Sequence, residues 1–414
     1  MSQPNACNPG FLCGKFGFSL SASVGISIWR GREREPFGRP GRWHLHEWPG
    51  KREWIMKILV ISLAGIGDTV LATPLIRELR ANFPQAQLDA LVRWAGARDV
   101  LHGNPNLNTV YQQNLMSEPV AKGFSFLRSL RSVGYDISIN AHPQSRIHYR
   151  AIARFIGAKI RISHVYEGWG LLDRILVNRT VPQDYSRHTV ENNLALLPLI
   201  GKTPLIPKHE LEICLSSEDT EWAGSFLTGQ DLTRRKRLGL HVGSGRTKNL
   251  ALKRWPLERY IELLGILRRS HPELAILLFG GPDEEEDLGR IQKAHPSPLV
   301  LRVHSKTLGQ AAALMQRCSA FLSVDTVHMH LAAAVKAPGQ IVIEAPTLNK
   351  TNEPFGNPFT VVKNPAVAGK NLDYYRYDGR GIKGSREDLI RCMESVSVSS
   401  VHRVVESVLG GNSA

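Results

Sequence analysis

The stretch Lys57-Ile-Leu-Val-Ile-Ser-Leu-Ala-Gly-Ile-Gly-Asp68 decides the fold. Its β-branched and leucine residues, Ile58 to Ile61, predict a strand that is buried on both faces. Gly65 and Gly67 then allow a tight turn, because glycine carries no side chain. Apolar residues at helical spacing follow, so a helix should pack back on the sheet. Such a unit is typical of an open parallel sheet, which binds ligands at the carboxyl ends of its strands.

The same unit recurs along the chain and indicates an α/β protein with two doubly wound, Rossmann-like domains. Further strands are predicted at residues 87–92, 109–111, 135–140, 159–162, 237–242, 274–279, 299–303, 320–324 and 340–343. Helices are predicted at 97–102, 123–133, 148–156, 189–200, 308–318, 331–335 and 400–409, with one more beginning at Pro256. The pattern loosens between 166 and 185, and the polar residues 216–220 are interpreted as a connecting segment.

Three regions follow from this pattern. Residues 1–55 are rich in Gly, Pro, Arg and Trp, and we expect a disordered extension or one that arises from a start site placed upstream of Met56. Residues 56–215 should form an N-terminal Rossmann-like domain. Residues 216–414 should form a C-terminal Rossmann-like domain that ends in a helix.

Composition narrows the class of partner. Of the 414 residues, 52 are Lys or Arg and 37 are Asp or Glu, so the formal net charge is +15. A basic surface suits a polyanion, an anionic membrane face or a phosphorylated glycan, although a merely soluble basic protein has the same composition. The five scattered cysteines lack metal-binding spacing and fit a reduced, cytoplasmic compartment. No apolar run approaches the roughly 18 residues of a membrane span, so any membrane contact should be peripheral.

Asp68 is the first candidate for chemistry. A carboxylate at the mouth of the first helix can accept the proton of an attacking hydroxyl, and the positive end of the helix dipole would also favour it there. The glycine pattern is a poor match to a nicotinamide-binding fingerprint, since Val70 stands where the third glycine is expected. No phosphate-binding loop of the Gly-x-x-x-x-Gly-Lys-Ser/Thr type occurs either.

Candidates for diphosphate binding follow a strand of the second half. Gly243 and Ser244 open a loop of small and hydroxyl residues, and Lys253 belongs to a nearby cationic cluster. Backbone N–H groups that approach closely, together with a fixed cation, are what a diphosphate needs. A solvated basic loop would look the same.

Two more strand ends carry polar residues. Asp325 and Thr326 precede an apolar helix, which Asp325 is expected to cap, and His330 lies one turn inside it. Glu284, four residues after Gly280, is placed to meet a ribose hydroxyl. The two histidines of the helix, His328 and His330, cannot face one another, so a metal pair is not expected.

Together these blocks resemble glycosyltransferase family 9, the lipopolysaccharide heptosyltransferases. The blocks are the strand into Gly67-Asp68, Gly243-Ser-Gly with Lys253-Arg-Trp-Pro, Phe279-Gly-Gly-Pro-Asp-Glu284 and Asp325-Thr-x-x-x-His330. The resemblance implies the GT-B architecture, a nucleotide-sugar donor such as ADP-heptose, inversion without a bound metal or cofactor, and an acceptor in the lipopolysaccharide inner core.

The resemblance also implies that residues 56–215 are the acceptor domain and residues 216–414 the domain that binds the nucleotide-sugar, and it implies residue roles. Asp68 would be the base, Lys253 the phosphate-binding lysine and Glu284 the ribose-binding carboxylate, with Asp325 and His330 in the donor-binding turn. Gly67, Arg146 and His188 are weaker candidates for the acceptor side. Val327 stands where the family usually has glycine, which should weaken donor binding.

The expected partners are a nucleotide-sugar, a phosphorylated glycolipid acceptor and the anionic cytoplasmic face of the inner membrane, but not nucleic acid. Two alternatives keep the same fold. One is transfer of another sugar to a different surface polysaccharide, and the other is a non-catalytic relative that binds glycan or nucleotide.

Overall fold

The computed structural model describes residues 55–245, 250–376 and 381–411. These residues belong to one compact unit, Trp54–Ala414. The expectations for residues 1–54 and for part of the loop after Ser244, residues 246–249, lie outside the described chain. Among the described residues, no helix combines the length and the apolarity that crossing a membrane would need.

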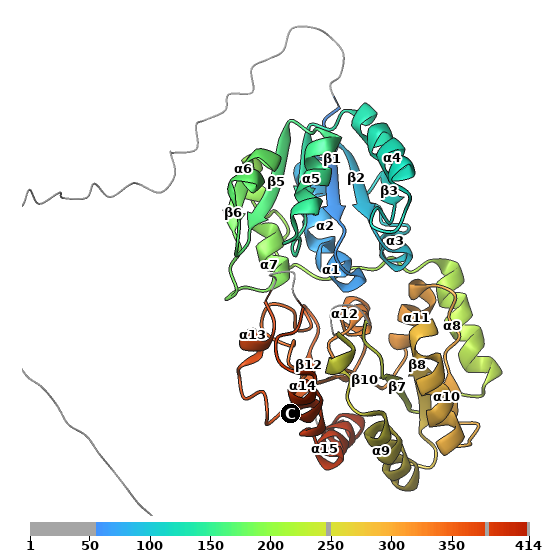
Figure 1. Ribbon diagram of the computed structural model, residues 1–414. Coiled ribbons are helices and arrows are strands. Elements are labelled where there is room, and N and C mark those ends of the chain that lie inside the picture. The colour runs from blue at the N-terminus through green and yellow to red at the C-terminus, as the bar shows by residue number, and fades with distance from the viewer. Residues whose placement is uncertain (1–54, 246–249, 377–380, 412–414) are drawn as a thin grey trace, which may run out of the picture. The chain divides into compact units, whose positions relative to one another are not determined.

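The first sheet has six parallel strands in the order β3-β2-β1-β4-β5-β6 (Figure 1). Its strands are β1 (Lys57–Ser62), β2 (Gln87–Val92), β3 (Thr109–Gln112), β4 (Ile137–Asn140), β5 (Ile160–Val165) and β6 (Arg179–Pro182). Its helices are α1 (Ile66–Leu71), α2 (Thr73–Asn82), α3 (Ala95–Leu101), α4 (Val120–Val133), α5 (Ile147–Ile156), α6 (Leu171–Leu176) and α7 (Thr189–Leu194), followed by the 3-10 helix η1 (Leu197–Ile200).

Both faces of this sheet are buried, as the apolar β1 run predicts. On one face Ile58 and Val60 pack with apolar side chains of α1, α2, α3 and α7. On the other face Leu59 and Ile61 pack with apolar side chains of α4 and α5. Alternate residues of one strand therefore enter two separate cores, because successive side chains of a strand point to opposite faces.

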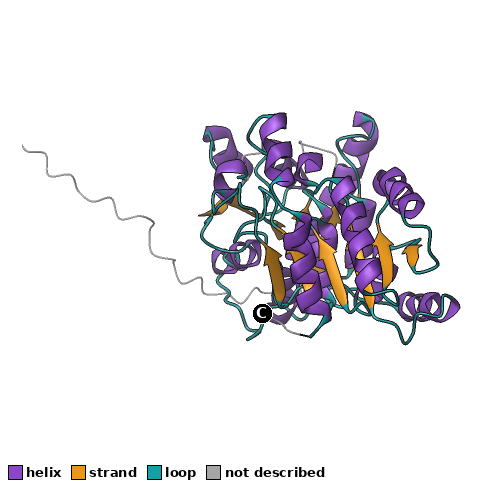
Figure 2. Cartoon of the chain, turned by 90° about the horizontal axis from the view of Figure 1, so that it is seen from below, coloured by secondary structure: helices purple, strands orange, loops and turns teal. Residues whose placement is uncertain are grey.

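The second sheet also has six parallel strands, in the order β12-β11-β10-β7-β8-β9. Its strands are β7 (Arg237–His241), β8 (Ala275–Phe279), β9 (Val300–Arg302), β10 (Ala320–Ser323), β11 (Gln340–Ile343) and β12 (Phe359–Val362). Its helices are α8 (Ser217–Gly229), α9 (Leu257–Ser270), α10 (Glu285–Ala294), α11 (Leu308–Met315), α12 (Val327–Ala334), α13 (Asn371–Tyr374), α14 (Arg386–Glu394) and α15 (Val398–Leu409). The 3-10 helices η2 (Leu250–Lys253) and η3 (Pro282–Glu284) precede α9 and α10. Helices flank its strands on both faces (Figure 2).

One apolar core joins the two halves, since it includes side chains from α1, α2 and α7 as well as from α8, α11 and α12. Helix α1 packs against α12 and α3 packs against α11. The Thr189 N–H donates to the Thr351 carbonyl oxygen at 2.8 Å. Each of α1, α3, α11 and α12 begins at the carboxyl end of a strand of its own sheet, so these two edges meet. The predicted α/β fold with two doubly wound sheets is confirmed.

Three predicted elements need correction. Residues 189–200 are not one helix, because Pro198 has no N–H to donate to the preceding turn; α7 ends at Leu194 and η1 follows. Residues 216–220 do not connect domains but begin α8, where Ser216 and Asp219 bond each other's backbone N–H in a capping box. The stretch that appeared patternless between 166 and 185 contains α6 and β6.

Candidate functional site

The carboxyl end of β1 places Asp68 in the first turn of α1. Its Oδ2 accepts a hydrogen bond from the Gly65 N–H at 2.6 Å, which closes the start of the helix. The positive end of the helix dipole stabilises an anion in this position. The structure thus gives Asp68 a capping role, while its role as a base stays a prediction.

Three cationic or aromatic side chains accompany Asp68 on this edge. Burial raises the pKa of the Tyr149 hydroxyl, and the charges of Arg146 and Arg93 oppose that rise. The charge of Asp68 also acts on Tyr149, so Arg146, Arg93 and Asp68 each lie within electrostatic reach of Tyr149. Arg146 is exposed and directly precedes α5. Arg93 and Tyr149 were not predicted, although Arg93 follows a predicted strand end, the signal that identified the other candidates.

A second group of predicted residues gathers at the ends of β7 and β8. Glu284 is buried, and its Oε2 accepts from the Gly281 N–H at 3.0 Å. Arg254 donates to Glu284 Oε1 at 2.8 Å and to the Ser244 carbonyl oxygen at 2.7 Å, which ties the two loops together. A Cβ on Gly243 would overlap the Glu284 side chain, so this position requires glycine.

Lys253 and Asp325 form a buried ion pair, with Nζ and Oδ2 3.2 Å apart. Asp325 Oδ2 also accepts from Thr347 Oγ1 at 2.5 Å and from Asn352 Nδ2 at 3.2 Å. Burial alone would raise the pKa of Asp325, but Lys253 and the Thr347 hydroxyl hold it below its ordinary value. Asp325 is therefore an anion that holds Lys253, Thr347 and Asn352 together.

The expectation that Asp325 caps the following helix is wrong. The N-cap of α12 is Thr326, whose Oγ1 accepts from the His328 N–H at 3.2 Å. Asp325 is held away from the helix end by the three donors described above. Thr347 and Asn352 escaped prediction because they come from the segment after β11, and no local spacing links that segment to Asp325.

The start of α12 meets the start of α1 at His330. A Cβ placed on Gly67 would lie 2.8 Å from His330 Cδ2, so the two helices touch where Gly67 lacks a side chain. Burial lowers the pKa of His330 to about 4, so its ring is neutral at pH 7. Its Nδ1 is buried and has no hydrogen-bond partner among the described residues. Because His328 and His330 are two residues apart on a helix, their side chains are predicted to point in different directions. His328 indeed stacks on His241, with ring centroids 3.7 Å apart.

His188 belongs to the contact between the two halves. Its Nδ1 accepts from the Val190 N–H at 3.1 Å, so its protonated Nε2 donates to the Glu353 carbonyl oxygen at 2.9 Å. Its ring stacks on Phe355 with centroids 4.7 Å apart. Burial lowers its pKa to about 4. His188 also forms a helix capping box with Glu191, whose Oε2 accepts from the His188 N–H at 2.8 Å.

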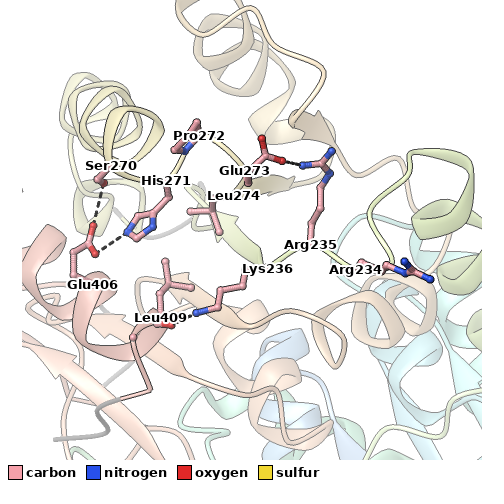
Figure 3. Close-up of a pocket in the computed structure, with 11 residues that line it drawn as sticks. Arg234, Arg235, Lys236, Ser270, His271, Pro272, Glu273, Leu274, Glu406 and Leu409 are labelled. Atoms are coloured by element: carbon pink, nitrogen blue, oxygen red, sulfur yellow. Dashed lines mark hydrogen bonds and ion pairs between the residues drawn. The ribbon is translucent and has the colours of Figure 1, made fainter.

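Two cavities lie in the second half. The first, about 470 Å³, lies between the ends of α9 and α15 and the start of β7, at the amino edge of the sheet (Figure 3). Most of its polar side chains already have hydrogen-bond partners within the cavity wall. His271 Nε2 is 2.7 Å from Glu406 Oε2, and Lys236 Nζ donates to the Leu409 carbonyl oxygen at 2.7 Å. The second, about 490 Å³, follows the carboxyl ends of β11 and β12 and is lined by Glu344, Asn349 and Lys350. Only the second adjoins the candidate site.

The sequence model described as glycosyltransferase family 9 (heptosyltransferase) matches residues 124–376. The chain belongs to this family. The family prediction is confirmed, and with it the prediction of a glycosyltransferase. Within the described residues no three His, Cys, Asp or Glu side chains are grouped to hold a metal ion.

Relatives of this family 9 glycosyltransferase are distant in sequence. Lipopolysaccharide heptosyltransferase 3 of Escherichia coli is 26% identical over 287 residues, which cover 66% of this chain and 78% of the relative. Lipooligosaccharide heptosyltransferase 2 of Haemophilus influenzae is 25% identical over 368 residues, 84% of this chain and 99% of the relative. The structure of ADP-heptose lipopolysaccharide heptosyltransferase II of E. coli superposes with a TM-score of 0.64 at 22% identity and covers 87% of this chain and all (100%) of its own. The GT-B fold is thus shared.

Proposed function

We propose that this family 9 glycosyltransferase transfers a heptose from ADP-heptose to the inner core of lipopolysaccharide, with inversion at the anomeric carbon. One observation carries the proposal. The proposed base and the proposed diphosphate site begin two helices, α1 and α12, that pack against each other at Gly67 and His330. The names of the E. coli and H. influenzae relatives support the choice of heptose and of a lipopolysaccharide acceptor.

The first sheet would supply the proton acceptor. An acceptor hydroxyl would attack the anomeric carbon and give its proton to Asp68, while the bond between that carbon and the diphosphate oxygen breaks. Arg93 and Arg146, which act on Tyr149 as Asp68 does, would hold the phosphates or carboxylates of the acceptor.

The second sheet would supply the donor site. The leaving diphosphate would gain negative charge near Lys253 and the positive end of the α12 dipole, both of which stabilise an anion. Neutral His330, with its unpartnered Nδ1, would hydrogen-bond the donor, and Glu284 would accept from a ribose hydroxyl. Lys253 and the helix would then balance the leaving charge without a metal or cofactor, so we expect a chelator to leave the rate unchanged.

The test is a donor and acceptor screen with the purified full chain. ADP-heptose and ADP-, UDP- and GDP-hexoses are each offered with heptose-deficient inner-core lipopolysaccharide, and product is detected by mass spectrometry. Transfer of a single heptose, dependent on the acceptor, supports the proposal. Transfer from another nucleotide-sugar with none from ADP-heptose would move the enzyme to a different surface glycan. A heptosyltransferase of the proposed kind would act on the cytoplasmic face of the inner membrane, where its glycolipid acceptor lies.

A further inference from the structure

Large apolar side chains are exposed at one edge of the first half. They lie at the starts of α4, α5 and α6, and their exposed fractions are 88% for Val120, 53% for Phe124, 46% for Ile147, 75% for Leu171, 64% for Leu172 and 59% for Ile175. Within α6, Leu171 and Ile175 are four residues apart and share a helix face. Nearly the whole length of this short helix therefore presents apolar groups to solvent. Contiguous apolar surface of this kind marks an interaction site.

The three helices that carry these side chains are neighbours in the fold. Helix α4 packs on α5 and α5 packs on α6 (Figure 1). Phe124 of α4 contacts Phe155 of α5 edge to face, with ring centroids 5.1 Å apart. Each of the three helices follows a strand of the parallel sheet, so its amino-terminal end lies at the carboxyl edge. Asp68, which follows β1, lies at that same edge.

Cations are interleaved with the apolar groups. Lys122, Arg146 and Arg174 are exposed and lie on or beside the starts of α4, α5 and α6. Over residues 118–182 the chain carries ten Lys or Arg against four Asp or Glu, and Lys122 forms an ion pair with Glu118 at 2.9 Å. The ion pair of Asp173 with Arg150 is buried, so neither of its charges counts toward the surface, which leaves nine cations against three acids. Apolar side chains flanked by Lys and Arg are typical of protein surfaces that insert into the interface of an anionic bilayer.

We propose that this docking surface, defined by the six apolar residues and three cations above, binds the anionic lipid surface of a membrane and presents Asp68 to the sugar of a membrane-embedded acceptor. Charge complementarity favours a bilayer over a second copy of the chain, because a symmetric dimer would bring the cations of two copies together. The proposal has two parts, lipid binding and the presentation of Asp68 to a lipid-borne acceptor. Only the second part rests on the proposed function. Lipid binding itself can be measured without donor or acceptor.

The test is binding of the full chain to vesicles of phosphatidylglycerol and phosphatidylethanolamine, compared with vesicles of phosphatidylcholine alone. The triple variant Leu171→Ser, Leu172→Ser, Ile175→Ser should lower the partition coefficient on anionic vesicles by at least about tenfold. A second variant on another helix, Val120→Ser with Phe124→Ser, should act in the same direction and excludes an effect of misfolded α6. Arg174→Ser should weaken binding by about fivefold and reduce its salt dependence.

Matched controls lie away from the docking surface. Leu205→Ser removes an apolar side chain that is 57% exposed, and Arg269→Ser removes an exposed cation of α9; both should bind vesicles like the wild type. Transfer to a delipidated, soluble acceptor should be unchanged in every variant, which separates a failure of docking from a failure of the proposed function. Equal binding of the wild type to both kinds of vesicle would overturn the proposal, and so would apolar variants that bind like the wild type. A concentration-dependent dimer that the triple variant abolishes, without vesicle binding, would also overturn it and assign the surface to a second copy.

Discussion

The carboxyl edges of the two sheets are built differently. On the second sheet the charged candidates are tied into buried networks: Lys253 to Asp325, and Arg254 to both Glu284 and Asp287. On the first sheet Asp68 closes a helix start, and the cations near it, Arg93 and Arg146, belong to an edge bordered by exposed apolar side chains. The buried networks hold the second edge rigid, which fits the nucleotide diphosphate that we propose for it. The exposed apolar border of the first edge fits the larger acceptor that we propose for it.

This difference predicts how substitutions should divide between the two edges. A change on the first edge should alter turnover and acceptor binding but leave the nucleotide in place. A change on the second edge should alter nucleotide affinity and also stability, because it breaks a buried network.

The largest effect should come from Asp68→Asn. The amide oxygen can still accept from the Gly65 N–H, so the helix start is preserved while the proton acceptor is lost. Turnover at saturating donor should fall by about 10² to 10⁴ with unchanged affinity for the nucleoside diphosphate. Steady-state kinetics and calorimetric titration measure the two quantities.

Asp219→Asn is the matched control, because Asp219 accepts from the Ser216 N–H at the start of α8 in the same capping geometry. It should leave turnover unchanged. If Asp68→Asn instead weakens the nucleotide and keeps its turnover, Asp68 is a binding residue and the contrast between the edges fails.

A smaller effect is expected from Lys253→Ala on the second edge. It removes a charge-assisted contact to the diphosphate and leaves Asp325 buried with only neutral donors, so the nucleotide should bind about 1.5 to 3 kcal/mol more weakly. The melting temperature should fall as well. Lys293→Ala, which removes an exposed lysine of α10, should change neither. Unchanged nucleotide affinity in Lys253→Ala would place the diphosphate elsewhere.

The contact between the edges should be sensitive to acid. Folding keeps His188 neutral down to about pH 4, whereas the unfolded chain protonates it near 6.5. Between these values the unfolded state binds more protons, so stability falls as the pH drops from 6.5 to 4. His188→Asn keeps a side chain able to cap α7 and should make this loss smaller by about 1 to 2 kcal/mol. Denaturant unfolding at pH 7 and at pH 4.5 measures the difference. The same substitution at exposed His102 should not reduce the loss.

Much of the fold was predictable because β1 and β8 are short apolar runs that end in glycine or a polar turn, the signature of a buried parallel strand. Helix α6 was not predictable for a physical reason. Three of its apolar residues face solvent, so it lacks the one-sided pattern by which a core-packed helix is recognised. The element whose pattern failed carries three of the six apolar residues of the docking surface, Leu171, Leu172 and Ile175.

For the site, the sequence identified which residues follow strand ends but not how they pair. Lys253 and Asp325 were both predicted to face a ligand, yet in the structure they bond each other. Thr347 and Asn352 complete the environment of Asp325 from 22 and 27 residues away. Pairings of this kind depend on how loops return to the sheet edge, which local spacing does not encode.

The smallest effect concerns Val327, the first residue of α12, where the family usually has glycine. The sequence alone suggests that its β-branched side chain keeps the diphosphate away from the helix start, so that Val327→Gly would tighten the nucleotide. In the structure Val327 is partly buried against the core that joins the two halves, and its Cα lies 3.7 Å from where a Cβ of Gly67 would be. Glycine should therefore cost stability, about 1 to 2 kcal/mol from lost packing and helix propensity, with a change in nucleotide affinity of less than about 0.5 kcal/mol. Calorimetric titration and denaturant unfolding of both proteins separate the two effects. A gain in affinity near 1 kcal/mol without loss of stability would show that Val327 faces the ligand. The side chain of Val327 would then keep the nucleotide from binding the second edge as tightly as that edge allows.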